Sequence, residues 1–209
     1  MAKNTSALRE GFNYTGELEL FDHAVNWKAY WVSLVSPWIG KNVLEVGAGI
    51  ASNTRRLCIH ETERWVCLEP DADQVRVMAG KQLPEKCECR EGTLDTVKAE
   101  ERFDTILYMD VLEHIENDTT EIANAAKHLN PGGHIVVLAP AWPFLFSPFD
   151  EEVGHFRRYT RASLLRCGAN VLTVRKAIYI DSVGFFASAA NRFILGASKP
   201  TINQIRLWD

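Results

Sequence analysis

The stretch Asn42–Gly49, Asn-Val-Leu-Glu-Val-Gly-Ala-Gly, constrains the fold more than any other part of the chain. Its apolar, mostly β-branched residues predict a short buried strand. Gly47 and Gly49 then allow a tight turn in which a ligand can approach the backbone closely. We expect a helix over residues 50–59, with its first N–H groups facing this turn. The order strand, glycine turn, helix is typical of a site for a nucleotide-like ligand, and the alternative is an ordinary crossover without a ligand.

A carboxylate inside the strand indicates which ligand would suit the turn. Glu45 lies two positions before Gly47, where it would repel a pyrophosphate but attract a ligand that carries positive charge. A dinucleotide site also requires a third glycine at the position of Ser52. Both features disfavour an NAD-dependent oxidoreductase.

The pattern Glu-x-Gly-x-Gly after an apolar strand resembles motif I of the class I S-adenosylmethionine (SAM) methyltransferases, with Ala51 where that family often has a third glycine. Farther along, Phe-Asp, Leu-Glu-His, Leu-Asn-Pro-Gly-Gly and Val-Val-Leu-Ala-Pro follow in the order of motifs IV and V. The resemblance therefore extends from about residue 42 to residue 165. It implies SAM as the cofactor and a Rossmann-like fold, with cofactor contacts at Glu45, Gly47, Ala48 and Gly49.

The remaining patterns predict an alternation of strands and helices. We expect strands over residues 64–69, 87–91, 103–108, 134–139 and 171–180, and helices over residues 17–39, 116–129, 161–167 and 181–196. Such alternation implies a doubly wound α/β fold, a mainly parallel sheet with helices on both faces. An antiparallel seventh strand, which the family normally has, is not evident. We expect one domain overall, with an N-terminal segment and amphipathic helix over residues 1–40 and the SAM-binding part over residues 41–209.

A second acid is expected at the edge of the sheet where the strands end. Glu69 closes the predicted strand 64–69, 20 residues after Gly49, and could accept hydrogen bonds from two ribose hydroxyls. The alternative is a capping role at the next helix, for which Asp71 is better placed than Glu69.

Other cofactor contacts come only from the resemblance. In the family, the loop after the third strand holds the adenine, which corresponds to Leu94 at the ring and Thr93 at the amino group. Many members have an acid where Thr93 stands, so Asp95 is the substitute, and a loop without a ligand is the alternative. The resemblance adds Pro70, Asp110 and Val111 to the cofactor contacts.

Acids and imidazoles gather after the strand 103–108. If the turn is helical, Asp110, Glu113 and His114 share one face. Together with His155, they resemble the Mg²⁺ site of plant small-RNA 2′-O-methyltransferases and ubiquinone-pathway O-methyltransferases. These four residues are thus candidate metal ligands, and Glu113, His114 and His155 are the catalytic candidates. The alternatives are a histidine base without metal, a cofactor or substrate contact for Asp110, and structural pairing of Glu113 with His114.

The segment around His155, Gly-His-Phe-Arg-Arg-Tyr, resembles bacterial methyltransferases of sugar, polysaccharide or secondary-metabolite pathways. It implies a small-molecule acceptor, methylated on a hydroxyl. Two alternatives remain open: a SAM-binding regulatory or scaffold subunit without turnover, and an RNA-end 2′-O-methyltransferase. Arg157 and Arg158 could hold an anionic acceptor or pair with acids at residues 150–152.

Composition limits the partners and the compartment. A net charge of −4 and a pI near 5.9 disfavour a protein that grips nucleic acid through its phosphates. No apolar run reaches the roughly 18 residues of a membrane span, and the first residues lack a signal-peptide core. The five cysteines predict reduced thiols in a cytoplasmic protein, not a disulfide framework or a zinc site. The sequence gives no indication of the oligomeric state.

Overall fold

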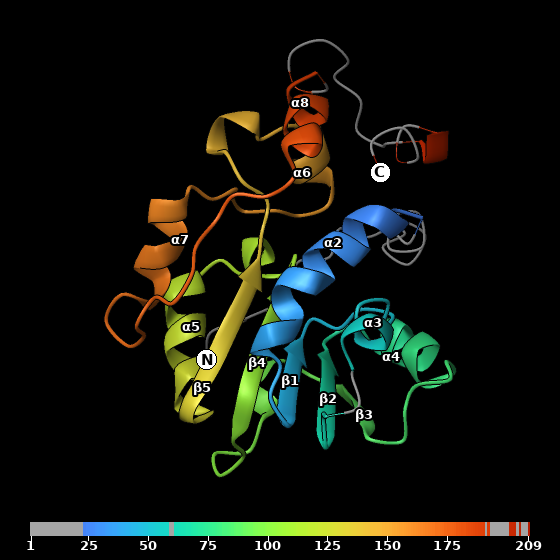
Figure 1. Ribbon diagram of the computed structural model, residues 1–209, viewed down its shortest axis with the longest axis vertical. Coiled ribbons are helices and arrows are strands. Elements are labelled where there is room, and N and C mark those ends of the chain that lie inside the picture. The colour runs from blue at the N-terminus through green and yellow to red at the C-terminus, as the bar shows by residue number, and fades with distance from the viewer. Residues whose placement is uncertain (1–22, 59–60, 191, 193–200, 204, 206–208) are drawn as a thin grey trace.

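Five parallel strands form one sheet in the order β3-β2-β1-β4-β5 (Figure 1). The computed structural model describes residues 23–58, 61–190, 192, 201–203, 205 and 209. Its strands are β1 (Asn42–Val46), β2 (Arg64–Glu69), β3 (Cys87–Glu91), β4 (Phe103–Met109) and β5 (Leu129–Leu138). The sheet grows outward in both directions from β1 and β4, which creates a crevice at their C-terminal ends. The predicted parallel α/β fold is therefore confirmed.

The helices of the described residues connect these strands and continue beyond β5. They are α2 (Val25–Val35), α3 (Thr54–Leu57), α4 (Ala72–Ala79), α5 (Asp118–Lys127), α6 (Pro148–Glu152), α7 (Arg161–Gly168) and α8 (Ser182–Ala190). Short 3₁₀ turns are η1 (Ser36–Trp38), η2 (Leu94–Thr96), η3 (Leu112–His114) and η4 (Pro143–Leu145). No helix of the described part has the length and apolar character needed to cross a bilayer.

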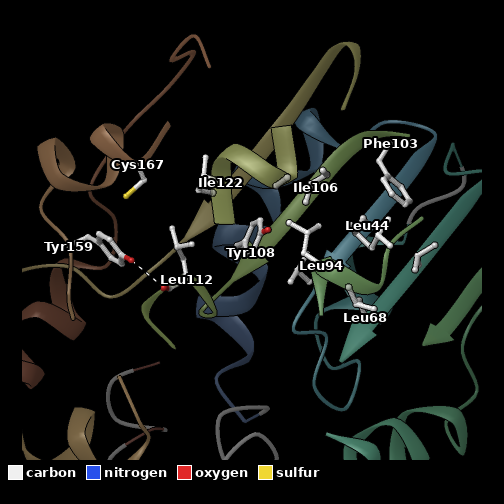
Figure 2. Packing of buried hydrophobic residues seen from close by; sticks show 14 residues of the cluster. Leu44, Leu68, Leu94, Phe103, Ile106, Tyr108, Leu112, Ile122, Tyr159 and Cys167 are labelled. Carbon is white, nitrogen blue, oxygen red and sulfur yellow. Dashed lines mark hydrogen bonds between the residues drawn. The ribbon is translucent and has the colours of Figure 1, made fainter. Parts of the chain in front are cut away.

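One face of the sheet carries the larger buried cluster (Figure 2). Leu44 and Val46 of β1 point to this face and meet Tyr108 of β4. Ile122 of α5 and Cys167 of α7 cover it from outside. Because successive side chains of a strand alternate, β1 delivers its other residues to the opposite face.

The opposite face is covered by α2 and α4. Val43 and Trp65 from the strands pack there against Trp31 of α2 and Met78 of α4. In Figure 1, α2 lies in front of the sheet and α5 behind it. Helices thus cover both faces, as predicted, and fix the C-terminal ends of the strands as the open edge.

Several predicted helices are shorter than expected. The predicted helix 50–59 is reduced to the four residues of α3, because Ala51 has a left-handed backbone (φ 60°) that no α-helix can contain. In place of the predicted helix 17–39, α2 and η1 cover residues 25–38, and residues 17–22 lie outside the described residues. Asp71 caps α4 by accepting hydrogen bonds from the backbone N–H groups of Asp73 and Gln74, as predicted.

The end of the sheet differs most from the prediction. The expected strand 171–180 is wrong: these residues form no strand. Its β-branched residues have no paired strand edge, and a cleft separates them from β5. The Asn-Pro-Gly-Gly sequence, predicted as a turn before the fifth strand, lies within β5 as an irregularity, because the β4–β5 register shifts between Phe103 and Thr105. Within the described residues no strand follows β5.

Candidate functional site

The turn after β1 has the backbone geometry that its glycines predict. Gly47 and Gly49 have φ angles of 65° and 56°, in the left-handed region that favours glycine. A Cβ at Gly47 would lie 2.6 Å from a methyl carbon of Val111, so the chain after β4 packs directly against the turn. Helix α3 has four residues and is too short to supply the expected row of helix N–H groups. The N–H groups of Ala48, Gly49 and Ala51 donate to the Leu68 carbonyl, the Glu69 carboxylate and the Ala48 carbonyl, so they are not available to a pyrophosphate.

Glu45 lies beneath this turn, and its hydrogen bonds are internal. Its carboxylate accepts hydrogen bonds from Thr54 Oγ1 at 2.6 Å and from Trp65 Nε1 at 2.9 Å. Burial raises the pKa of Glu45 to about 7, although the two hydrogen bonds oppose the shift. The side chain is 1% exposed. Because Thr54 is the first residue of α3, Glu45 holds the start of this helix beneath the turn through a buried hydrogen bond.

Glu69 joins the turn to the end of β2. Its Oε2 accepts a hydrogen bond from the Gly49 N–H at 2.9 Å, and its Oε1 accepts one from the Asp71 N–H at 3.0 Å. Burial raises the pKa of this carboxyl, against the two backbone hydrogen bonds. Each oxygen retains a second lone pair and so the capacity to accept one further hydrogen bond.

Asp110 stands at the end of β4 and is open to the crevice. Its φ of 56° is left-handed, and η3 begins only at Leu112, so the condition under which Asp110 would share one helical face with Glu113 and His114 is not met. Desolvation of the carboxyl by the surrounding protein raises the pKa of Asp110, and the positive charge of Lys28 opposes this shift. Lys28, from α2, is 8% exposed. Lys28 therefore places a positive charge close to Asp110, a neighbour that the sequence does not predict.

Glu113, His114 and His155 form the chemical centre of the crevice. One ligand atom from each lies within 4.8 Å of those of the others. Glu113 Oε1 is 3.9 Å from His155 Nε2, and the two imidazole rings meet edge to face at 4.6 Å between centroids. Both carboxylate oxygens of Glu113 are buried without a hydrogen-bond partner. Burial raises the pKa of Glu113, whereas burial and His155 lower that of His114 to about 3. Asp110 lies outside this group.

Asp150 of α6 orients His155 from behind. Its Oδ1 lies 2.8 Å from His155 Nδ1, and Arg158 donates to both oxygens at 2.7 and 2.8 Å. Burial alone would raise the pKa of Asp150, but hydrogen bonds from His155 and Arg158 bring it well below its usual value. With Nδ1–H donated to Asp150, the lone pair of His155 Nε2 faces Glu113.

Three contacts hold the segment that carries His155 against η3. The Phe156 N–H donates to the Glu113 carbonyl at 2.8 Å, and Arg157 donates to the Glu116 carbonyl at 2.7 Å. The Tyr159 hydroxyl lies 3.2 Å from the Leu112 carbonyl, the contact drawn in Figure 2. Residues 155–159 and 112–116 therefore form one platform, although they are far apart in sequence.

Both arginines of the segment have partners within the protein. Arg158 pairs with Asp150, as one of the alternatives predicted, and Arg157 pairs with Asp118 at 2.6 Å. An anionic acceptor would have to compete with these carboxylates, so the arginines are better understood as supports of the platform.

A cleft of about 1180 Å³ contains most of these groups. Its lining includes seven of the predicted site residues, namely Gly47, Ala48, Gly49, Asp110, Glu113, His114 and His155. The other predicted cofactor contacts, Glu45, Glu69, Pro70, Thr93, Leu94, Asp95 and Val111, do not line it. Leu94 is 3% exposed and belongs to the buried cluster of Figure 2, whereas Thr93 and Asp95 are exposed.

Sequence reasoning missed two residues of the site. Lys28 lies on a helix that the sequence places before the glycine turn, and no pattern connects it with Asp110. For Asp150, the sequence indicates only a role as a partner of the arginines. A local signal for the contact between Asp150 and His155 was present. Ser147 and Asp150 form a capping box at the start of α6, and His155 follows this short helix closely in the chain.

The fold and the crevice define a class of protein, the class I SAM methyltransferases. Residues 31–171 match the family described as the methyltransferase domain, and this match includes β1 to β5 and the platform of His155. The chain belongs to this family.

Known proteins resemble the chain at low sequence identity. An uncharacterised 37.1 kDa protein from a transposon of Streptomyces fradiae is 26% identical over an alignment of 161 residues, with 75% of this chain and 46% of the relative covered. The chain thus spans about half the length of this curated relative.

Two solved structures share the fold. A putative methyltransferase of Haloferax volcanii, in complex with the Trm112 activator, has a TM-score of 0.66 at 14% identity, with 87% of this chain and 88% of that chain covered. Coclaurine N-methyltransferase, bound to N-methylheliamine and SAH, has a TM-score of 0.62 at 14% identity, with 77% and 53% covered.

Proposed function

We propose that the chain transfers the methyl group of SAM to a hydroxyl of a small-molecule acceptor. The observation that carries this proposal is the buried, unpartnered carboxylate of Glu113 beside two imidazoles, next to the glycine turn. A protein that only bound SAM would have no use for an uncompensated carboxylate at this place, where burial raises its pKa.

The cofactor fits the turn because of its charge and shape. Gly47 and Gly49 leave backbone without side chains at the crevice, and Asp110 faces it with a carboxylate. A sulfonium cation near Asp110 would compete with Lys28 for this negative charge. Glu69 is proposed to accept the ribose hydroxyls with its remaining lone pairs, and Glu45 to act by holding the turn. Adenine contacts at residues 93–95 remain predictions from the family resemblance.

The reaction needs little from the protein besides alignment and removal of one proton. The methyl group of a sulfonium is already activated, so the acceptor oxygen must be placed behind it in line with the sulfur. A hydroxyl nucleophile also loses a proton. His155 can accept this proton at Nε2, since Asp150 holds the opposite nitrogen and stabilises the imidazolium that results.

A divalent metal also fits Glu113, His114 and His155. The orphaned carboxylate of Glu113 would gain a partner, and Asp150 would be the outer carboxylate behind a ligating imidazole. The bound ion would lower the pKa of an acceptor hydroxyl. Mg²⁺ prefers an all-oxygen octahedron, whereas two imidazoles and one carboxylate suit first-row ions such as Mn²⁺ or Zn²⁺. We therefore propose a first-row ion in place of the Mg²⁺ suggested by sequence.

Metal binding can be tested without an acceptor. Thermal unfolding of the chelator-treated protein would be followed with added Mn²⁺, Zn²⁺ or Mg²⁺, for the wild type, Glu113→Gln and the exposed control Glu151→Gln. We expect Mn²⁺ or Zn²⁺ to raise the Tm of the wild type and the control, but not of Glu113→Gln. Equal shifts in all three proteins would place the ion elsewhere, and no shift would leave His155 as a base without metal.

The acceptor is proposed to be a ring-containing metabolite. Trp142 stacks on Tyr179 with ring centroids 4.4 Å apart, and Phe185 meets Trp142 edge to face at 5.8 Å. These three side chains line the cleft together with His155 and offer flat apolar surfaces to a ring. All five cysteines are free thiols, which fits a reducing compartment, and we propose that the reaction takes place in the cytoplasm.

Methyl transfer from labelled SAM to a panel of sugars, phenols and other hydroxyl metabolites tests the proposed function. His155→Ala should abolish transfer but leave SAM affinity nearly intact, and the exposed His23→Ala should behave as the wild type. SAM binding without transfer to any acceptor would favour a regulatory subunit, and transfer only to RNA ends would favour an RNA methyltransferase. Unchanged turnover in His155→Ala would remove this histidine from the mechanism.

A further inference from the structure

Three thiols meet on the face of the sheet covered by α2 and α4, outside the crevice. Cys58 follows α3, Cys67 lies in β2 and Cys87 begins β3. The Cys87 thiol donates to Cys58 Sγ at a distance of 3.5 Å between sulfurs. Cys67 is buried and is a hydrogen-bond neighbour of Cys87, whereas Cys58 and Cys87 are each half-buried. A pair of thiols this close is separated from bond distance by about 1.5 Å.

The close pair is connected to the glycine turn through α3. The Cys58 N–H donates to the Thr54 carbonyl at 2.8 Å and so closes α3. Thr54 holds Glu45 with its hydroxyl and contacts Cys67 Sγ at 3.7 Å. The thiols are therefore connected through one short helix to the carboxylate that supports the turn.

The two thiols differ in reactivity. As a thiolate, Cys87 accepts hydrogen bonds from Cys67 and Cys58, which lowers its pKa to about 7 despite partial burial. Burial, with Cys87 beside it, raises the pKa of Cys58 to about 12. Burial also raises the pKa of Cys89, the next cysteine on the same face of β3. Since the thiolate is the nucleophile, Cys87 should react before its neighbours.

We propose that Cys58 and Cys87 form a disulfide when the protein meets a hydroperoxide. The Cys87 thiolate attacks one peroxide oxygen, the O–O bond breaks, and Cys87 becomes a sulfenic acid while hydroxide leaves and is protonated to water. Cys58 sulfur then attacks the Cys87 sulfur, the S–O bond breaks, and a second water leaves with the thiol proton. In sum, two thiols are oxidised and one H₂O₂ is reduced to two waters.

The disulfide would join the end of α3 to the start of β3. It closes a loop between residues 29 positions apart, which restricts the unfolded chain. We expect the Tm to rise by roughly 5–10 °C on oxidation and to return after reduction with dithiothreitol. The disulfide is a property of this thiol group and does not depend on the proposed acceptor.

Peptide mapping of the full chain after treatment with H₂O₂ tests this inference, without any substitution. We expect a non-reduced peptide pair that joins Cys58 to Cys87, a loss of two of the five thiols and a mass decrease of about 2 Da. A bond from Cys87 to Cys67 or Cys89, or no bond while all five thiols remain, would overturn the proposal.

Variants separate the two steps. In Cys58→Ser, the sulfenic acid of Cys87 should persist and be trapped by dimedone, whereas Cys87→Ser should leave Cys58 unmodified. Cys89→Ser is the matched control on the same strand face and should form the disulfide as the wild type does. The proposal is wrong if Cys58→Ser, folded by circular dichroism, shows no dimedone adduct at Cys87, or if Cys89→Ser prevents the bond.

Discussion

Substitution of Gly47 by alanine tests the packing of the glycine turn against the chain after β4. Gly47→Ala imposes a side chain on a left-handed backbone (φ 65°), which costs about 1–2 kcal/mol. The new Cβ would lie 2.6 and 2.9 Å from the two methyl carbons of Val111, and relief of such overlap costs about 1–3 kcal/mol more. We expect a total loss of about 2–5 kcal/mol in the free energy of unfolding.

Two further variants separate the two costs. Gly132 has a φ of 81°, and no atom lies within 4 Å of the place that a Cβ would take there, so Gly132→Ala measures the backbone cost alone. In the double variant Gly47→Ala/Val111→Ala the steric cost should disappear. The free energy of unfolding of the double variant should then be lower than that of Val111→Ala only by the cost of the left-handed backbone, about 1–2 kcal/mol.

Urea unfolding and calorimetric titration with SAM provide the two readouts. Because Val111 adjoins Asp110, relief of the overlap displaces the crevice wall, and we expect SAM affinity to fall at least about tenfold in Gly47→Ala, or about 1.4 kcal/mol. Val111→Ala should restore part of this loss. If Gly47→Ala costs no more than Gly132→Ala, or if SAM binds equally well, the turn does not pack as described.

Three further predictions concern carboxylates. Burial raises the pKa of Glu45 to about 7, so its contribution to stability is present below pH 4.5 and is lost as pH rises through 7. Between pH 5 and pH 8 the free energy of unfolding should fall by about 2.5 kcal/mol in the wild type, and Glu45→Gln should lack this fall. Hydrogen bonds from Arg90 and Arg64, against burial, lower the pKa of Glu101 to about 2, so the contribution of Glu101 to stability is present above pH 4.5 and disappears as pH falls through 2. Glu101→Gln should lower the free energy of unfolding by about 2 kcal/mol at pH 7 and leave it unchanged near pH 2. An equal loss at both pH values would contradict this prediction. Asp150→Asn leaves a nearly buried arginine without its partner and should cost about 3–5 kcal/mol in urea unfolding, with loss of methyl transfer; a neutral result would show that the pair is not formed.

The three central strands could be predicted from sequence because nearly all their residues are buried on both faces. β3 (Cys87–Glu91) has the predicted bounds although three of its five residues are charged and none is fully buried. The apolar run within β2 predicts that strand with the bounds that the structure has. The expected strand 171–180 has the same local pattern and failed, because pairing depends on a neighbouring edge that local sequence does not encode. The expected helix after the turn failed because alanine rarely adopts the left-handed backbone that Ala51 has; the glycine that the family often has at this position was the available signal.

The site could be predicted where its residues follow motifs. Glu113, His114 and His155 were expected to meet, and the structure places them together. Asp110 was grouped with them as a candidate metal ligand, which required a helical turn; its left-handed backbone breaks this turn, and Asp110 lies outside the group. Lys28 could not be found, since its proximity to Asp110 depends on how α2 packs across the sheet. Tertiary packing decides such contacts, and periodicity does not report it.

Calorimetric titration of the wild-type protein with SAM, SAH and NAD⁺ tests the central claim most directly. The acids around the glycine turn, together with the short α3 and the internally bonded N–H groups of the turn, predict that SAM and SAH bind and NAD⁺ does not. Glu69→Gln should weaken both nucleosides, since its carboxylate is proposed to accept the ribose hydroxyls. Binding of NAD⁺ in competition with SAM, or no heat from SAM and SAH with the folded protein, would contradict the account.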